Sequence, residues 1–102
     1  MAYEIASRIE SGRKAVSTAG VAEKIIAAST HCFMVLISAD LGNTGPVVVG
    51  NADVVAAAGS QKGVVLTPGN PPVMFLVRDV SSIYADSQND GDAVCFVYFA
   101  TS

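Results

Sequence analysis

The side chains best suited to nucleophilic chemistry are His31 and Cys32, the single histidine and one of two cysteines. A cysteine–histidine pair is catalytic only when the imidazole can take the thiol proton. Neighbouring residues on a β-strand point to opposite faces, so this spacing predicts that the two side chains do not meet. The sequence also lacks a Gly-x-Ser-x-Gly motif that would hold a serine for a triad with His31. We therefore expect no enzymatic activity and no catalytic residues.

Two loops carry residue types that bind ions in other proteins. In the acidic stretch 86–92, Gln88 takes the third position of an EF-hand loop and Val97 the twelfth, and neither fits that template. In the stretch 59–63, Lys62 precedes the second glycine and strand-forming residues follow, unlike a phosphate-binding loop. Both stretches are predicted to be turns, and we expect no cofactor and no metal site. A cation held in another geometry is the alternative for the acidic loop.

The two cysteines, Cys32 and Cys95, lie beside or inside apolar runs, which favours buried free thiols. A disulfide between them requires Cα atoms within about 7 Å, and the sequence leaves this pairing open. Two cysteines and one histidine are also too few for a four-ligand structural zinc site.

The elements that would position these side chains are short apolar runs separated by Gly, Pro, Asn and Asp. From Phe33 onward, strand-length runs alternate with turn sequences such as 40–46, 68–72 and 86–92. This spacing predicts an all-β fold, a small antiparallel β-sandwich or jelly-roll-like domain of about seven or eight strands over residues 13–102.

The first thirty residues have a different pattern. Ile5 and Ile9 are one helical turn apart, and Gly12 interrupts the segment, which predicts an N-terminal arm over residues 1–12, extended or as a short helix. The stretch 21–28 has the composition of a helix, but Gly20 and Ser29 limit it to the length of a strand. We favour a strand there, with a helix as the alternative.

Two runs, 73–77 and 93–99, are apolar at odd and even positions alike. Strands of an open sandwich normally alternate apolar and polar residues, so both faces of these strands should be covered. The outer cover would be the chain's own N-terminal segment or a neighbouring subunit. We expect a homo-oligomer, a dimer or trimer, with Tyr3, Ile5 and Ile9 as candidate partner contacts.

Composition narrows the classes of partner. The chain has 102 residues, of which 51% are hydrophobic, and a formal net charge of −3. Its six Lys and Arg residues are spread along the sequence, which argues against nucleic acid or an anionic membrane as partner. The first ten residues do not have the pattern of a secretory signal, and cytosolic assembly is expected.

The stretch 43–54 fits the pattern NTG-x-(V/I)-x-VG-(N/D)-x-x-V, and further turn-and-strand motifs follow it at 66–69, 79–86 and 89–98. In this order, the motifs resemble those of small virion-associated proteins of tailed bacteriophages. Each motif alone has low specificity, whereas their order and spacing over residues 13–99 are more distinctive.

The resemblance implies a structural protein of the phage particle, most closely a capsid decoration or cement protein. Such a protein binds the exterior of the head, assembled in the host cytoplasm, and ties major capsid subunits together. The alternative is a tail, neck or fibre accessory that binds a protein or a host surface. The resemblance brings no catalytic residues, and it implies structural roles for Asp79 as a loop cap and Tyr84 as a strand anchor.

Overall fold

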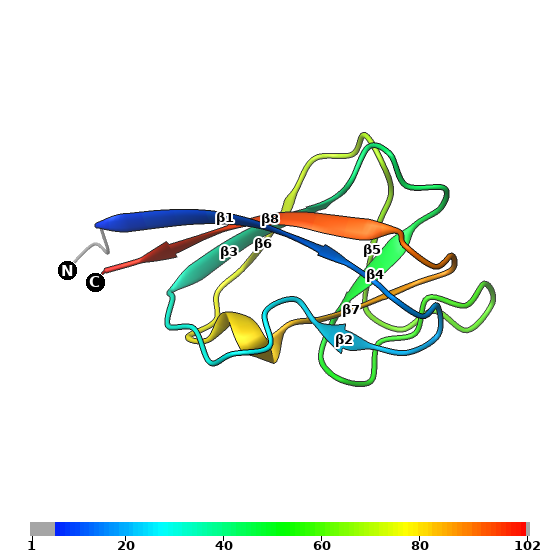
Figure 1. The fold of residues 1–102 in the computed structure, drawn as a ribbon, viewed down its shortest axis with the longest axis horizontal. Helices are drawn as coiled ribbons and strands as arrows, with labels where there is room; N and C mark the ends of the chain where they lie inside the picture. Colours follow the sequence, from blue (N-terminus) through cyan, green and yellow to red (C-terminus); the bar gives the residue numbers. More distant parts are fainter. Residues whose placement is uncertain (1–5, 102) are drawn as a thin grey trace.

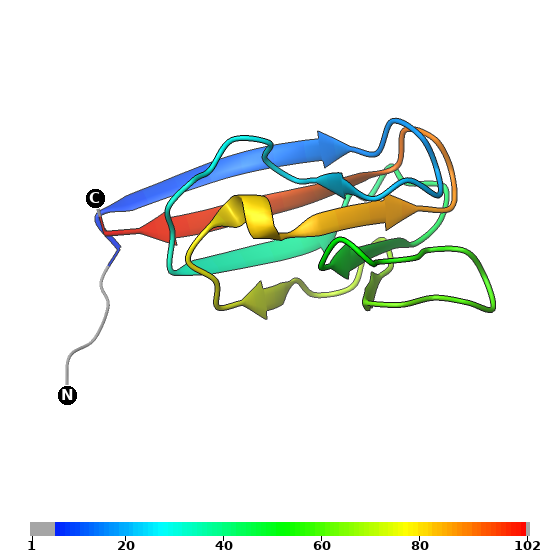
Figure 2. The same cartoon turned by 90° about the horizontal axis from the view of Figure 1, so that it is seen from below.

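A computed structural model, which describes residues 6–101, shows two antiparallel four-stranded sheets packed against each other (Figures 1 and 2). Sheet A has the strand order β1-β8-β3-β6, and sheet B has the order β2-β7-β4-β5. This arrangement confirms the predicted all-β sandwich. The strands are β1 (Arg8–Ala15), β2 (Glu23–Lys24), β3 (Met34–Ala39), β4 (Val47–Gly50), β5 (Val64–Leu66), β6 (Val73–Phe75), β7 (Tyr84–Ser87) and β8 (Ala93–Ala100), with a short 3₁₀ helix η1 (Val80–Ser82) before β7.

The core lies between the sheets and is built mostly from valine, isoleucine and alanine. Sheet A contributes alternate residues of β3 and β8, including Val35, Ile37 and Val94, and sheet B contributes Val47 and Val49. β-branched side chains fit a pleated surface well, which is why this composition folds as sheet rather than as packed helices.

The molecule is elongated, with principal extents of 43 × 24 × 22 Å. β1 and β8 pair along eight residues each, from Arg8 opposite Ala100 to Ala15 opposite Ala93. Figure 1 shows this long pair running past sheet B toward the end of the molecule where the described chain begins and ends. Within residues 6–101, no helix is long and apolar enough to cross a membrane.

The predicted N-terminal arm over residues 1–12 is wrong for its second half. Residues 8–12 are part of β1 and pair with residues 96–100 of β8, so they belong to the sandwich. The sequence obscured this strand because Arg8, Glu10 and Lys14 stand at positions where an apolar alternation would be expected. Arg8 and Glu10 are exposed to solvent, and Lys14 is half-buried.

The stretch 21–28 contains a strand and no helix, as favoured from the sequence, but the strand is only two residues long and bends follow it. β2 covers Glu23 and Lys24, which pair with Ala85 and Tyr84 of β7. The backbone N–H of Ile25 then donates to the carbonyl of Ile83 at 3.0 Å, and the Ile25 side chain is buried in the core.

Candidate functional site

The structure separates the two residues that could have formed a nucleophilic pair. His31 is exposed, whereas Cys32 is buried and its Sγ donates to the carbonyl of Val77 at 3.2 Å. Burial, with a smaller contribution from the negative charge of Asp79, raises the pKa of the Cys32 thiol. A buried thiol with a raised pKa is a poor nucleophile. Both cysteines are free thiols, although Cys95 is only half-buried.

The carboxylates of the acidic loop bind backbone amides of the protein itself. Asp86 is buried and accepts hydrogen bonds from the N–H groups of Gly20 and Ala56, at 2.8 and 2.9 Å. The tip of the loop is a turn, as predicted, with Gly91 at φ +86°. Among residues 6–101, no group of three or more His, Cys, Asp or Glu side chains is placed to hold a metal ion.

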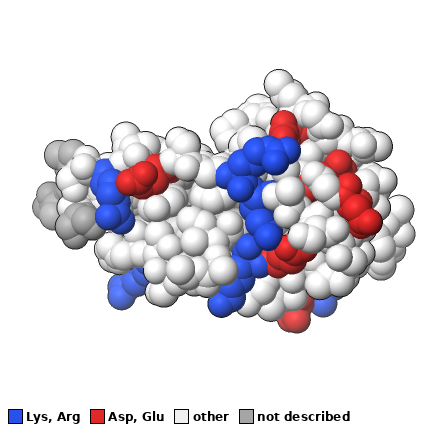
Figure 3. Space-filling model, viewed as in Figure 1, with Lys and Arg blue, Asp and Glu red and all other residues white. Residues whose placement is uncertain are grey.

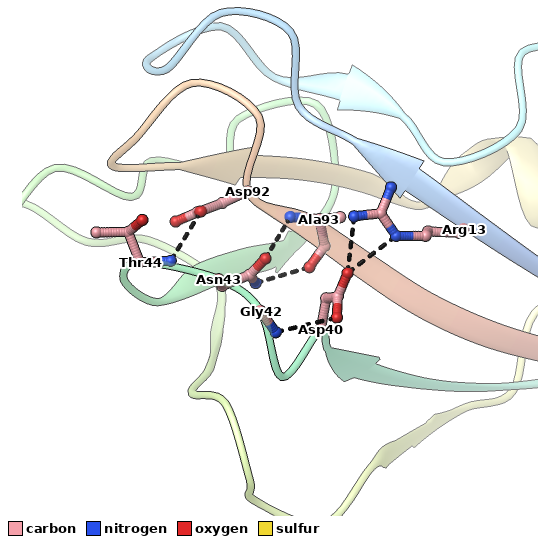
Figure 4. A network of polar contacts seen from close by, with 7 residues as sticks. All are labelled: Arg13, Asp40, Gly42, Asn43, Thr44, Asp92 and Ala93. Carbon is pink, nitrogen blue, oxygen red and sulfur yellow. Dashed lines mark hydrogen bonds and ion pairs between the residues drawn. The ribbon is translucent and has the colours of Figure 1, made fainter.

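Two of the sequence motifs that follow the phage-protein pattern meet in space (Figure 4). The side-chain amide of Asn43 donates to the carbonyl of Ala93 at 2.8 Å and accepts from its N–H at 2.7 Å. The carboxylate of Asp92, which is buried, accepts from the N–H groups of Thr44 and Gly45 at 2.9 and 3.0 Å. The motif residues therefore fix the β3–β4 connection to the start of β8.

Asp79 acts as the cap of η1, the structural role that the resemblance implied. Its carboxylate accepts from the hydroxyl of Ser29, from the N–H of Thr30, and from the N–H and hydroxyl of Ser81. These hydrogen bonds, with that of Ser29 the largest contribution, hold the pKa of Asp79 well below its ordinary value. The residue stabilises two connections and offers no free carboxylate for catalysis.

The outer faces of the two sheets differ in how the chain covers them. On sheet B, Val48 points away from the main core and is fully buried in a small second cluster with Val54 and Ala56 from the following loop. Tyr84 of β7 packs against the same cluster, a position that fits a strand anchor. The chain therefore covers much of the outer face of sheet B with its own loop.

The outer face of sheet A carries three exposed apolar side chains. The exposed fractions are 62% for Ile9, 57% for Met74 and 72% for Leu76. The strand registers place the outward residues in rows across the sheet. One row contains Ser11, Val97, Leu36 and Met74, and the next contains Ile9, Phe99 and Met34. Within residues 6–101 no further strand or helix lies over these rows.

A shallow groove of about 370 Å³ lies on this face. Its lining includes Leu36, Val97, Cys95 and Pro72. Figure 1 shows the connections 40–46 and 67–72 rising above sheet A at one end.

At the end of sheet A where these connections rise, Arg13 forms an ion pair with Asp40 at 2.7 Å. The N–H of Gly42 and the Arg13 guanidinium lower the pKa of Asp40. The outer face of sheet A is thus an apolar surface with a charged boundary, which we call the A-face.

The structure describes only one of the three predicted contact residues. Ile9 lies on the A-face, in β1, whereas Tyr3 and Ile5 lie outside the described residues. Leu36 of β3 and Met74 of β6 also lie on the A-face and were not among the predicted contact residues. The signal was present, because both strands are apolar at odd and even positions, but strand order was needed to bring these residues together.

Comparison with protein-family models, with curated proteins and with solved structures gave no match for this chain. The resemblance to phage virion proteins therefore rests on the sequence motifs alone, and the residues of those motifs that the structure explains have structural roles.

Proposed function

We propose that this chain is a non-enzymatic structural subunit of a bacteriophage particle, a capsid decoration protein. It binds the outside of the head through the A-face and stabilises contacts between major capsid subunits. The observation that carries the proposal is the A-face itself, because contiguous exposed apolar residues on a small domain are typical of protein-binding surfaces. The motif resemblance supplies the context of a virion.

The geometry of the A-face suits docking to a protein. Its centre is apolar and its end near Arg13 is charged, an arrangement like the apolar core and polar rim of protein interfaces. The groove lies at the charged end and could accept a side chain or a loop of the partner. The subunits of a capsid shell present the same binding site many times, so many copies of the chain can bind one particle.

The test begins by finding the chain in virions of the phage that encodes it. Virions are separated into heads and tails, and each fraction is probed with an antibody against the chain. We expect the chain in the head fraction. A signal in tails alone would overturn the decoration role and favour the tail, neck or fibre accessory.

The A-face is then tested by rebinding to heads from which the chain has been removed. We expect Met74→Lys to weaken rebinding, because a charge would be buried in the apolar centre of the interface. Val65→Lys is the matched control, since Val65 is 42% exposed and lies on sheet B. Equal rebinding of the two variants would overturn the assignment of this face.

A further inference from the structure

Within residues 6–101, no strand pairs with the outer edge of β1. β1 is the terminal strand of sheet A and pairs with β8 in one unbroken register of eight residues. It contains no proline, and no bulge interrupts its pairing. An edge strand of this length presents backbone N–H and C=O groups that can pair with another strand. β1 is the strand nearest the viewer in Figure 1, so Figure 3 shows the charges along this edge.

The alternation of the ladder determines which residues offer their backbone groups at the edge. The N–H of Val16, just past the end of β1, donates to the carbonyl of Asp92 at 2.8 Å. In an antiparallel pair such hydrogen-bonded positions recur at every second residue. The backbone N–H and C=O groups of the even-numbered residues of β1 therefore point toward β8. The backbone groups of the odd-numbered residues point to the free edge; these residues are Ile9, Ser11, Arg13 and Ala15.

We propose that β1 pairs antiparallel with β1 of a second copy of this chain, about a two-fold axis at Gly12. This register places Ile9 opposite Ala15 and Ser11 opposite Arg13, so that residues with free backbone groups pair with each other. It also places Glu10 of each copy opposite Lys14 of the other. The two copies then share one continuous eight-stranded sheet.

Charge selects this register over its neighbours. Because both copies must present the same face, the register can shift only in steps that keep odd residues opposite odd residues. One step in one direction places Arg8 opposite Lys14, and the next places Glu10 opposite Glu10. One step in the other direction places Arg13 opposite Arg13. Like charges directly opposite each other are destabilising, so the register at Gly12 is favoured.

Lys14 is well placed for the cross-strand contact. It already forms an ion pair with Glu23 at 2.8 Å, on the side of β1 that faces sheet B. Glu10 of the second copy would add a second carboxylate beside the same ammonium group. The pairing goes beyond the proposed function, because it needs only a second copy of the chain and no virion. It would also place the two A-faces side by side on one sheet.

A charge exchange between Glu10 and Lys14 tests the proposal. Sedimentation of the wild-type chain should show a dimer. The variant Glu10→Lys should raise the dimer dissociation constant about tenfold or more, because symmetry changes two cross-strand pairs at once. Lys14→Glu alone should weaken the homodimer similarly. A mixture of the two variants should recover dimers, since each Glu10 and Lys14 position then faces an opposite charge.

Asp53→Lys is the matched control, an equal change of charge at an exposed loop residue far from β1 in the sequence. It should leave the dimer unchanged. A wild-type chain that stays monomeric at millimolar concentration would overturn the proposal, as would a dimer that tolerates Glu10→Lys. Failure to recover dimers in the mixture would do so too, provided that circular dichroism shows both variants folded. Head binding can succeed or fail independently of these results.

The register is tested by cross-linking. Opposite hydrogen-bonded residues have Cα atoms about 5.5 Å apart, within the range that a disulfide requires. The double variant Ile9→Cys, Ala15→Cys, made with Cys95→Ser, should form a covalent dimer on oxidation. Ile9→Cys alone in the same background should remain uncross-linked. A cross-linked dimer of the single variant would overturn this register.

Discussion

At the residue scale, Asp92 connects the β3–β4 turn to β8, since its carboxylate accepts from the N–H groups of Thr44 and Gly45. Asp92→Ala would leave these N–H groups without their partner, and Asp92 itself is only 5% exposed. We expect the free energy of unfolding to fall by about 3 kcal/mol, measured by urea denaturation. Asp53→Ala, an exposed acid, should change it by less than about 0.5 kcal/mol. Equal effects of the two changes would contradict the role of Asp92.

Gly12 is required by close packing on the ring of Phe96. A Cβ atom at this position would lie 2.5 Å from Cζ of that ring. Gly12→Ala should therefore destabilise the fold by about 1–3 kcal/mol in thermal or urea denaturation. In the double variant with Phe96→Leu, the smaller side chain leaves room for the new methyl group, so the two costs should be less than additive. If the destabilising effects of the two substitutions were strictly additive, the close approach of Gly12 to the Phe96 ring would not be the cause of the Gly12→Ala effect.

The lowered pKa of Asp79 gives the stability of the fold an acid dependence. In the unfolded chain an aspartate has a pKa of about 3.9, whereas hydrogen bonds lower the value in the fold. The unfolded state therefore binds more protons below pH 4. The contribution of the Asp79 carboxylate to the free energy of unfolding is lost as pH falls through the pKa of the folded state.

Replacing Asp79 by alanine should flatten this dependence. Urea denaturation between pH 5 and pH 2 should show the wild-type free energy of unfolding falling more steeply than that of Asp79→Ala. A residual slope is expected in the variant, because the pKa values of Asp40 and Glu23 are also lowered. Parallel curves for the two proteins would contradict this account.

At the scale of elements, Cys95 reports on the A-face and Cys32 reports on the core. Cys95 is half-buried on the A-face, and Cys32 is buried with a raised pKa. We expect a thiol reagent to modify Cys95 in the folded protein and Cys32 only after unfolding, as followed by mass spectrometry of the labelled peptides. Equal rates for the two thiols in the native state would contradict the assignment of these faces.

The elements also show what the sequence could and could not predict. The alternation of valine-rich runs with turn residues was enough for the sandwich, because strand length and turn chemistry are local properties. The A-face was not predictable residue by residue, since Leu36 and Met74 meet only through the order β8-β3-β6. β1 was missed for a related reason. Its pairing with β8 joins residues 78 to 92 positions apart, and the charged residues on its inner face hide the alternation typical of a strand.

At the scale of the whole molecule, the first and the last strand of the described chain lie side by side in sheet A. β1 and β8 lie next to each other in sheet A, so the first described strand protects one edge of the last. Removing β1 would expose the β8 edge and the ring of Phe96, which lies against Gly12. An exposed strand with apolar residues on both faces favours aggregation.

Two truncations separate the role of β1 in the fold from any role of the residues before it. Deletion of residues 1–6 keeps the whole β1–β8 ladder, and we expect a cooperative unfolding transition to remain. Deletion of residues 1–12 removes five of the eight β1 residues that pair with β8. We expect this shorter chain to lose cooperative unfolding, followed by circular dichroism, and to aggregate on sedimentation. A folded, monomeric product of the longer deletion would show that residues 8–12 act as an arm after all, because the remaining strands would then suffice for the core.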